Sequence, residues 1–167
     1  MGGVRLMLEL EAFTADAESV VEPLRKTGYR FFTLAQTPDD EVTRRKLYAL
    51  VREGVTDTTG FSGEFETYGA FTERIYVSSY RQHAESQFLA AYGNEWVGLS
   101  SFVLDTAERG KFGLTAVTRP HRGLGLARAL KLLALRHAQT RGVQTVVTEN
   151  HPDNVAILKL NKTLGFR

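Results

Sequence analysis

The stretch KFGLTAVTRPHRGLGLARALKLLALRHA, residues 111–138, decides the fold of this chain. Residues 111–118 form a strand-like apolar run, and the hydrophobic period changes after Arg122. From there, one broad and largely apolar face recurs at helical spacing: Leu126, Ala129, Leu130, Leu133, Ala134, His137 and Ala138. The opposite, polar side carries Arg128, Lys131, Arg136 and Gln139. The stretch therefore predicts a strand, a turn and a long helix that ends at Gly142.

Two glycines, Gly123 and Gly125, lie where this strand gives way to the helix. Glycine lets the backbone pass close to a ligand, and the first N–H groups of a helix have no partner within it. Together with the helix dipole, these donors predict an anion site suited to phosphate. The alternative is a tight glycine turn without a ligand. The segment is not a G-x-x-x-x-G-K-[ST] loop, and GLGLAR lacks the third glycine of the dinucleotide fingerprint.

The rest of the chain is predicted to alternate between strands and helices. Strands are expected at residues 4–13, 29–34, 86–92, 95–105 and 144–149. Short turns join 86–92, 95–105 and 111–118, so these three are expected to form an antiparallel meander. Helices are expected from Thr14 to Gly28 with an interruption at Pro23, from Asp39 to about Glu53, around Phe71 and Ile75, and from Pro152 to Gly165. Residues 54–70, with four glycines and four threonines, are predicted to be a long loop.

Length and composition restrict the class of protein. The 167 residues suit one domain, and an apolar fraction of 43% is enough for a buried core. Because the chain has no cysteine, it has no disulfide, no thiolate metal site and no thiol nucleophile. Its four histidines, His83, His121, His137 and His151, show no metal-ligand spacing, so no metal is expected.

Charge and hydropathy bear on the partners. Glu9 and Glu11 interrupt the first apolar run, which is therefore no signal peptide, and no stretch has the roughly 20 apolar residues of a membrane span. A nucleic-acid module could use the basic side chains Arg119, Arg122, Arg128, Lys131 and Arg136, but the net charge of +2 is too small to favour it. We expect a cytoplasmic protein that binds neither membrane nor nucleic acid.

Three segments resemble the GNAT superfamily of N-acetyltransferases. RGLGLA, residues 122–127, matches R/Q-x-x-G-x-G/A, the acyl-CoA pyrophosphate motif of that superfamily, and TAVTRPH is similar to the strand and turn before it. Downstream, Asn154-Val155-Ala156 and Leu164-Gly165-Phe166 resemble the N-x-x-A…LGF segment. The sequence TENHPDN…NKTLGFR is more similar to one half of two-domain members, such as the mycothiol synthases, than to an average single-domain member.

The resemblance implies an α/β (α+β) fold. Its mixed central sheet would have antiparallel N-terminal strands, a splayed pair of parallel strands and helices on both faces. The splayed strands would be 111–118 and 144–149, and pantetheine would enter the gap as though it were a strand. The GNAT-like domain would cover residues 29–167 without the usual final strand, and residues 1–28 would be a strand–helix extension.

The resemblance also assigns an acetyl-CoA site. Backbone groups of Ala116 and Val117 would bond the pantetheine, and the Val117 N–H would polarise the thioester carbonyl. Asn154 would reach the pantetheine arm, or else it caps the last helix. The pyrophosphate would be held by backbone N–H groups of Arg122, Gly123, Leu124, Gly125, Leu126 and Ala127.

Direct attack by an amine on the acetyl thioester needs a base. Glu149 is one candidate because it ends a splayed strand, and the others are Glu64, Glu66 and Glu95. Many members have a tyrosine that protonates the departing thiolate where this chain has Asn161, which can donate a hydrogen bond but is no acid near neutral pH. A tyrosine elsewhere could supply that proton: Tyr48, Tyr68, Tyr76 or Tyr80.

We therefore expect an enzyme that transfers the acetyl group of acetyl-CoA to the primary amine of a small molecule. The alternative is a catalytically silent domain that binds or senses acyl-CoA, which the asparagine at position 161 favours. The acceptor pocket of this fold comes from variable loops, here residues 54–72.

The two ends of the sequence give a further expectation. Family members usually continue past LGF, whereas this sequence stops at Arg167 and begins with the additional unit 4–28. An unfinished sheet leaves unpaired edge groups. We expect residues 4–13 to pack against the C-terminal region, within one subunit or across a homodimer. The alternative is a chain cut from a longer two-domain protein.

Overall fold

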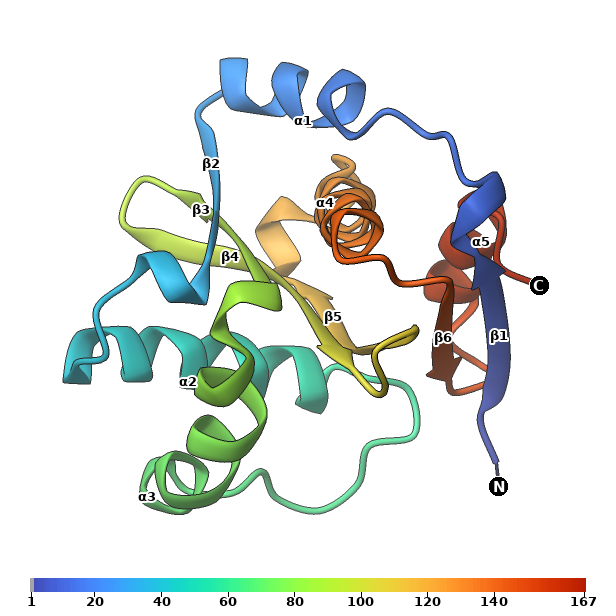
Figure 1. The fold of residues 1–167 in the computed structure, drawn as a ribbon. Coiled ribbons are helices and arrows are strands. Elements are labelled where there is room, and N and C mark those ends of the chain that lie inside the picture. Colours follow the sequence, from blue (N-terminus) through green and yellow to red (C-terminus); the bar gives the residue numbers. More distant parts are fainter. Residues whose placement is uncertain (1) are drawn as a thin grey trace.

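The computed structural model describes residues 2–167 as a six-stranded sheet with helices on both faces (Figure 1). The strands are β1 (Val4–Glu9), β2 (Tyr29–Thr33), β3 (Gln87–Tyr92), β4 (Glu95–Leu104), β5 (Arg109–Val117) and β6 (Thr145–Asn150). The helices are α1 (Ala17–Lys26), α2 (Glu41–Thr56), α3 (Tyr68–Ala70), α4 (Leu126–Thr140) and α5 (Val155–Thr163). A π-helix, η3 (Phe71–Tyr80), continues α3, and 3-10 turns form η1 (Leu10–Ala12), η2 (Leu34–Gln36), η4 (Arg81–Ser86) and η5 (Arg119–His121).

The sheet is mixed, with the strand order β1-β6-β5-β4-β3-β2. Neighbouring strands run antiparallel except β5 and β6, which are parallel. This confirms the expected fold class, including the antiparallel meander of β3, β4 and β5 and the single parallel pair.

The parallel pair is short. Residues 109–111 of β5 pair with residues 145–147 of β6, and the pairing stops there although both strands continue. Figure 1 shows the two strands moving apart beyond this point. The expected splay is therefore present, and it leaves one side of the β5 backbone from Phe112 onward without a neighbouring strand.

A bulge in β5 lies at the same place. Ser100 pairs with Thr115 and Phe102 pairs with Phe112, so two steps along β4 match three steps along β5. An extra residue bends its strand and changes the face that the following side chains take. Phe112 consequently belongs to the core on the α4 side of the sheet, whereas Leu114 packs against the core on the α2 side.

The N-terminal strand completes the sheet beside β6. β1 pairs antiparallel with all of β6, from Val4 opposite Asn150 to Glu9 opposite Thr145. On its other side, the Met7 N–H donates to the Arg167 carbonyl at 2.8 Å and the Arg167 N–H donates to the Met7 carbonyl at 2.9 Å. The expected packing of residues 4–13 against the C-terminal region is thus confirmed within one chain, although the strand ends at Glu9, where the turn η1 begins.

Two hydrophobic cores lie on opposite faces of the sheet. One is built by β1, α1, α4 and the segment after α5, and the other by α2, η2, η3 and η4. In Figure 1, α1 and α4 lie on one side of the strands, and α2 and α3 lie on the other.

The ends of two helices differ from the sequence prediction. α1 begins at Ala17 after Asp16, whose carboxylate accepts from the Glu18 N–H at 3.0 Å, so Thr14 is not the cap. The helix also continues through Pro23 without interruption. Proline removes the hydrogen bond to the carbonyl four residues earlier, and that residue, Ser19, is exposed, where water can satisfy the carbonyl. α5 begins at Val155, three residues after Pro152.

α2 is longer than predicted and ends at Thr56, because Gly54 lies inside the helix. A Cβ atom at position 54 would lie 2.5 Å from the Cβ of Ala116. Only glycine permits this approach of α2 to β5. The glycine that was read as the start of a loop is therefore a packing contact, and the loop between α2 and α3 covers residues 57–67.

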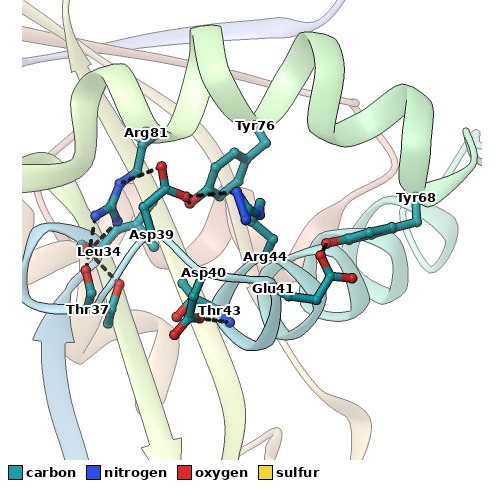
Figure 2. A network of polar contacts seen from close by, with 10 residues as sticks. All are labelled: Leu34, Thr37, Asp39, Asp40, Glu41, Thr43, Arg44, Tyr68, Tyr76 and Arg81. Carbon is teal, nitrogen blue, oxygen red and sulfur yellow. Dashed lines mark hydrogen bonds and ion pairs between the residues drawn. The ribbon is translucent and has the colours of Figure 1, made fainter.

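The start of α2 is fixed by the polar network in Figure 2. The Tyr76 hydroxyl donates to the Asp39 carboxylate at 2.6 Å. Arg81 donates to the carbonyls of Leu34 and Thr37 at 2.9 and 3.0 Å. Burial and the hydrogen bond to Asp39 raise the pKa of Tyr76 to about 12, so its phenol stays a neutral donor. The network ties the loop before α2 to η3 and η4 and so steadies the helix that reaches β5.

Lys131 is buried, contrary to its expected place on a polar side of α4. Its residue is 1% exposed, and its Nζ lies 3.8 Å from the ring centroid of Phe112 and 5.8 Å from that of Phe166. The division of α4 into one apolar and one polar side is misleading here, because α4 is covered both by the sheet and by α1. Burial lowers the pKa of Lys131 to about 7.

We expect Lys131→Met to raise the free energy of unfolding, and to raise it most below pH 7. The folded lysine titrates at about 7 and the unfolded one at 10.5, so between these values the unfolded chain binds a proton that the folded chain has released. The wild-type protein therefore gains stability as the pH rises through this window, and the advantage of Met shrinks. Urea unfolding of both proteins at about pH 6, 8 and 10 measures the difference. An advantage that stays constant with pH would contradict the prediction.

Candidate functional site

A cavity of about 400 Å³ opens beside β5, beyond the point where β5 leaves β6. Four parts of the chain line it. They are the end of α2 with Gly54, Asp57, Thr58 and Thr59; β5 with Thr115, Ala116 and Val117; the turn and start of α4 with His121, Arg122, Gly123, Gly125, Leu126, Ala127 and Arg128; and α5 with Asn154, Ala156, Ile157 and Leu160. The cavity thus has an apolar channel along β5 and α5 and a polar end at the start of α4.

The polar end presents a row of free backbone donors. The first backbone hydrogen bond of α4 runs from the Ala129 N–H to the Gly125 carbonyl. The N–H groups from Gly123 to Arg128 have no acceptor within the described residues. Gly123 and Gly125 have φ angles of +77° and +93°, with open space where a Cβ atom would be. Successive N–H groups in this conformation at a helix N-terminus form an anion-binding concavity.

Two arginines and one carboxylate frame this end. Arg122 donates from Nε to the Val117 carbonyl at 2.7 Å and from Nη2 to Asp57 at 2.9 Å, and Arg119 donates to Asp57 at 3.1 Å. The hydrogen bond from Arg122 holds the pKa of Asp57 below its usual range. The ion pairs join the end of α2 to the glycine turn, so the residues after α2 form one wall of the cavity.

His121 is held from behind by a buried tyrosine. The Tyr29 hydroxyl lies 2.7 Å from Nδ1 of His121, and Tyr29 is 7% exposed. Burial raises the pKa of Tyr29, so the phenol keeps its proton and can donate it to Nδ1. This contact fixes His121 as part of the cavity wall.

The structure brings together almost all of the residues expected at the acetyl-CoA site. Every one of them lines the cavity except Leu124, which is 54% exposed. Asn154 lines it and also caps α5, because its Oδ1 accepts from the Ile157 N–H at 3.4 Å. Capping and lining were posed as alternatives, and the geometry allows both.

The two side chains expected to take part in catalysis, Glu149 and Asn161, do not line this cavity. Glu149 is exposed at the end of β6 beside Gly3. Val147 pairs with Lys111, and side chains two residues apart share a face, so Glu149 is on the same face as Lys111. Asn161 is fully buried, and its Nδ2 donates to Asn150 Oδ1 at 3.0 Å. The Asn161 Oδ1 is buried without a partner.

The other candidate acids and tyrosines lie outside the cavity as well. Glu64 and Glu95 are exposed, and Glu66 faces Arg74 at 3.7 Å. Three tyrosine hydroxyls are engaged elsewhere: Tyr48 donates to the Glu66 carbonyl, Tyr68 to Glu41 and Tyr76 to Asp39. Tyr80 is buried in the core on the α2 side of the sheet.

A second cavity, of about 470 Å³, lies on the α2 face of the sheet at the bulge of β5. Its walls come from η3, the kink at His83, β4 and residues 111–114 of β5. Its lining residues with polar side chains are Ser78, Ser79, Tyr80, His83, Ser101 and Lys111. The two cavities therefore follow one another along β5, with 111–114 lining one and 115–117 lining the other.

Sequence reasoning missed the α2 wall of the first cavity. Asp57, Thr58 and Thr59 lie in a segment predicted to be a long loop. That segment is expected to supply the acceptor pocket, yet Gly54, Asp57, Thr58 and Thr59 line the first cavity and no residue of 54–72 lines the second. Only the contact of Gly54 with Ala116 brings these residues to the cavity.

Two negative observations apply to residues 2–167. No group of three or more His, Cys, Asp or Glu side chains there could hold a metal ion. None of the described helices has both the length and the apolar character needed to cross a membrane. Of the basic residues of α4 and its turn, Lys131 is buried, Arg119 and Arg122 pair with Asp57, and Arg136 pairs with Glu18.

Solved structures share this fold. Ard1 from Thermoplasma volcanium is 18% identical, with 84% of this chain and 83% of that chain covered and a TM-score of 0.65. The NatC complex bound to Gag peptide and CoA contains a chain that is 21% identical, with 84% and 85% covered and a TM-score of 0.67. A tandem GNAT protein from the clavulanic acid biosynthesis pathway is 21% identical over 99% of this chain and 50% of that chain, with a TM-score of 0.65.

Sequence comparison identifies the family. No curated protein shows significant similarity to this chain. The expected likeness to mycothiol synthases is tested by none of these matches and stays a prediction. The sequence model of the Acetyltransferase (GNAT) family matches residues 48–166, which include the glycine turn and both cavities' β5 walls. The chain therefore belongs to the GNAT family of CoA-dependent acetyltransferases.

Proposed function

We propose that this protein transfers the acetyl group of acetyl-CoA to the primary amine of a small molecule, by direct attack within a ternary complex. The observation that carries the proposal is the row of free N–H groups from Gly123 to Arg128 at the mouth of a channel along β5. Those donors suit the pyrophosphate, and the channel suits a pantetheine arm. From Phe112 onward β5 has no neighbouring strand on the side facing the splay, so its backbone groups on that side can bond the arm, except the Val117 carbonyl, which already accepts from Arg122 Nε at 2.7 Å.

The second cavity is the acceptor site in this proposal. It meets β5 at the bulge, next to the segment that lines the first cavity, so an amine bound there approaches the thioester from the opposite face. Glu149 serves as the base because its register places it on that face. The lining contains Lys111 and His83 and no carboxylate, which favours an acceptor that carries an anionic group beside its amine.

A thiol-release assay with acetyl-CoA and mixed small amines tests the proposal. We expect release that depends on the amine and is stronger with amino acids than with the corresponding decarboxylated amines. CoA binding without release for any amine would favour the silent acyl-CoA-binding domain. No CoA binding at all would contradict the proposed function.

Gly125→Asp should weaken CoA binding by at least about tenfold, because it places bulk and negative charge among the donors and costs one or two charge-assisted hydrogen bonds. Calorimetric titration measures the affinity. Gly142→Asp is the matched control, since Gly142 has a φ of +76° and equally open space but lies at the far end of α4. Equal losses in the two variants would mean that backbone strain alone explains the effect.

Glu149→Gln should lower kcat about a hundredfold with little change in CoA affinity, because the amide cannot accept the proton of the attacking amine. Steady-state kinetics with the best amine of the screen measure the change. Glu95→Gln, which changes an exposed acid at the start of β4, is the control. Full activity of Glu149→Gln would assign the base to another group, with His83 of the second cavity as the next one to test.

A further inference from the structure

The side-chain nitrogen of Lys131 has no polar partner. None of the hydrogen bonds or ion pairs in the described part of the chain involves its Nζ, which lies over the face of Phe112 at 3.8 Å. A cation–π contact of this kind favours the charged form and orients it. Even so, a buried lysine with three unused donors costs stability, and nothing in the packing of α4 requires it.

Lys131 lies near the closed end of the splay, which is the point where β5 and β6 stop pairing and begin to separate. Phe112 directly follows Lys111, the last β5 residue that pairs with β6. The second ring near Nζ belongs to Phe166, in the segment after α5. The backbone N–H of Phe166 donates to the Asn161 carbonyl at 3.0 Å. Lys131 and Asn161 therefore approach the same end of the splay from two different helices.

The proposed reaction directs its leaving group toward that end. A pantetheine arm whose pyrophosphate sits at residues 123–128 must run back along Val117, Ala116 and Thr115 toward Phe112. Phe112 lies three residues beyond Thr115 in this direction, and the Nζ of Lys131 lies over its ring. Asn161 has no ionisable proton to give the CoA sulfur, and the hydroxyls of Tyr48, Tyr68 and Tyr76 are engaged elsewhere. Tyr80 lines the second cavity and packs in the core on the α2 side, across the sheet from Lys131.

We propose that Lys131 is the acid that protonates the departing CoA thiolate, a role that deepens and rests on the proposed acetyl transfer. The acceptor nitrogen forms its bond to the acetyl carbon, the carbon–sulfur bond breaks, and its electron pair stays on sulfur. The Lys131 ammonium gives one proton to that sulfur and becomes a neutral amine. The acceptor nitrogen loses one proton to the base, and proton exchange with water returns both groups to their starting forms.

The electrostatic surroundings of Lys131 suit this role. Its pKa of about 7, set by burial, lets it give up a proton near neutral pH. No charged side chain opposes it from the packed elements: Glu18 of α1 pairs with Arg136, Glu149 and Lys111 are on the other face of the sheet, and Lys159 and Lys162 of α5 are exposed.

The acidity of bound CoA tests the proposal without turnover. A nearby ammonium should make the thiol of bound CoA more acidic, so its ultraviolet thiolate absorbance should emerge at lower pH than in Lys131→Met. We expect the acid dissociation constant of bound CoA to differ by about tenfold or more between the two proteins. Lys159→Met, an exposed lysine of α5, is the control and should match wild type.

Kinetics supply the second readout. Lys131→Met should lower kcat about a hundredfold with an unchanged KM for acetyl-CoA, and it should remove the decline of kcat above neutral pH. Lys131→Gln, a neutral polar variant, should behave like Lys131→Met, so a folding defect of one variant leaves the test intact. Unchanged CoA acidity and kcat in variants that bind CoA would overturn the role of Lys131 while leaving acetyl transfer in place. Wild-type protein that binds no CoA would instead overturn the proposed function.

Discussion

The separation of β5 from β6 is the constraint on which the rest of the structure depends. A strand that leaves its neighbour exposes backbone groups that must find other partners. Here the parallel pairing ends at Lys111 and Val147, and the cavity begins a few residues later at Thr115. The arrangement holds because each strand is paired on its other side, β5 by β4 on both sides of the bulge and β6 by β1 along its whole length. β1 in turn is bonded to Arg167, so both ends of the sequence support the opening.

The ends of α2 and α4 form two walls of the cavity at this opening. Gly54 allows α2 to reach Ala116, and Asp57 then ties the end of the helix to Arg119 and Arg122. Exposed ion pairs contribute little to stability. Their effect in this protein is positional, since they keep the loop after α2 beside the glycine turn and so make a cavity from what would be an open groove.

The closed end of the splay combines apolar packing with unsatisfied polar groups. Phe112 and Phe166 pack edge to face there, and beside them lie the ammonium of Lys131 and the unpartnered Oδ1 of Asn161. Buried polar atoms without partners cost more than their hydrogen bonds would return, and folded proteins tolerate them mainly at functional sites.

The sequence by itself determined the order and type of the elements, because the periods of residues 111–138 and the turn glycines act locally. It also indicated the anion-binding turn, since Gly123, Gly125 and the start of α4 are neighbours in the chain. The local sequence pattern gave wrong predictions where contacts with distant segments determine the structure. Gly54 marks a helix packed on β5 rather than a loop, Pro23 is tolerated because Ser19 is exposed, and Lys131 is buried because α1 covers α4. Only the tertiary structure brought Asp57 and His121 into one cavity wall and set Asn161 opposite Asn150, because these pairings join residues that pattern and spacing cannot relate.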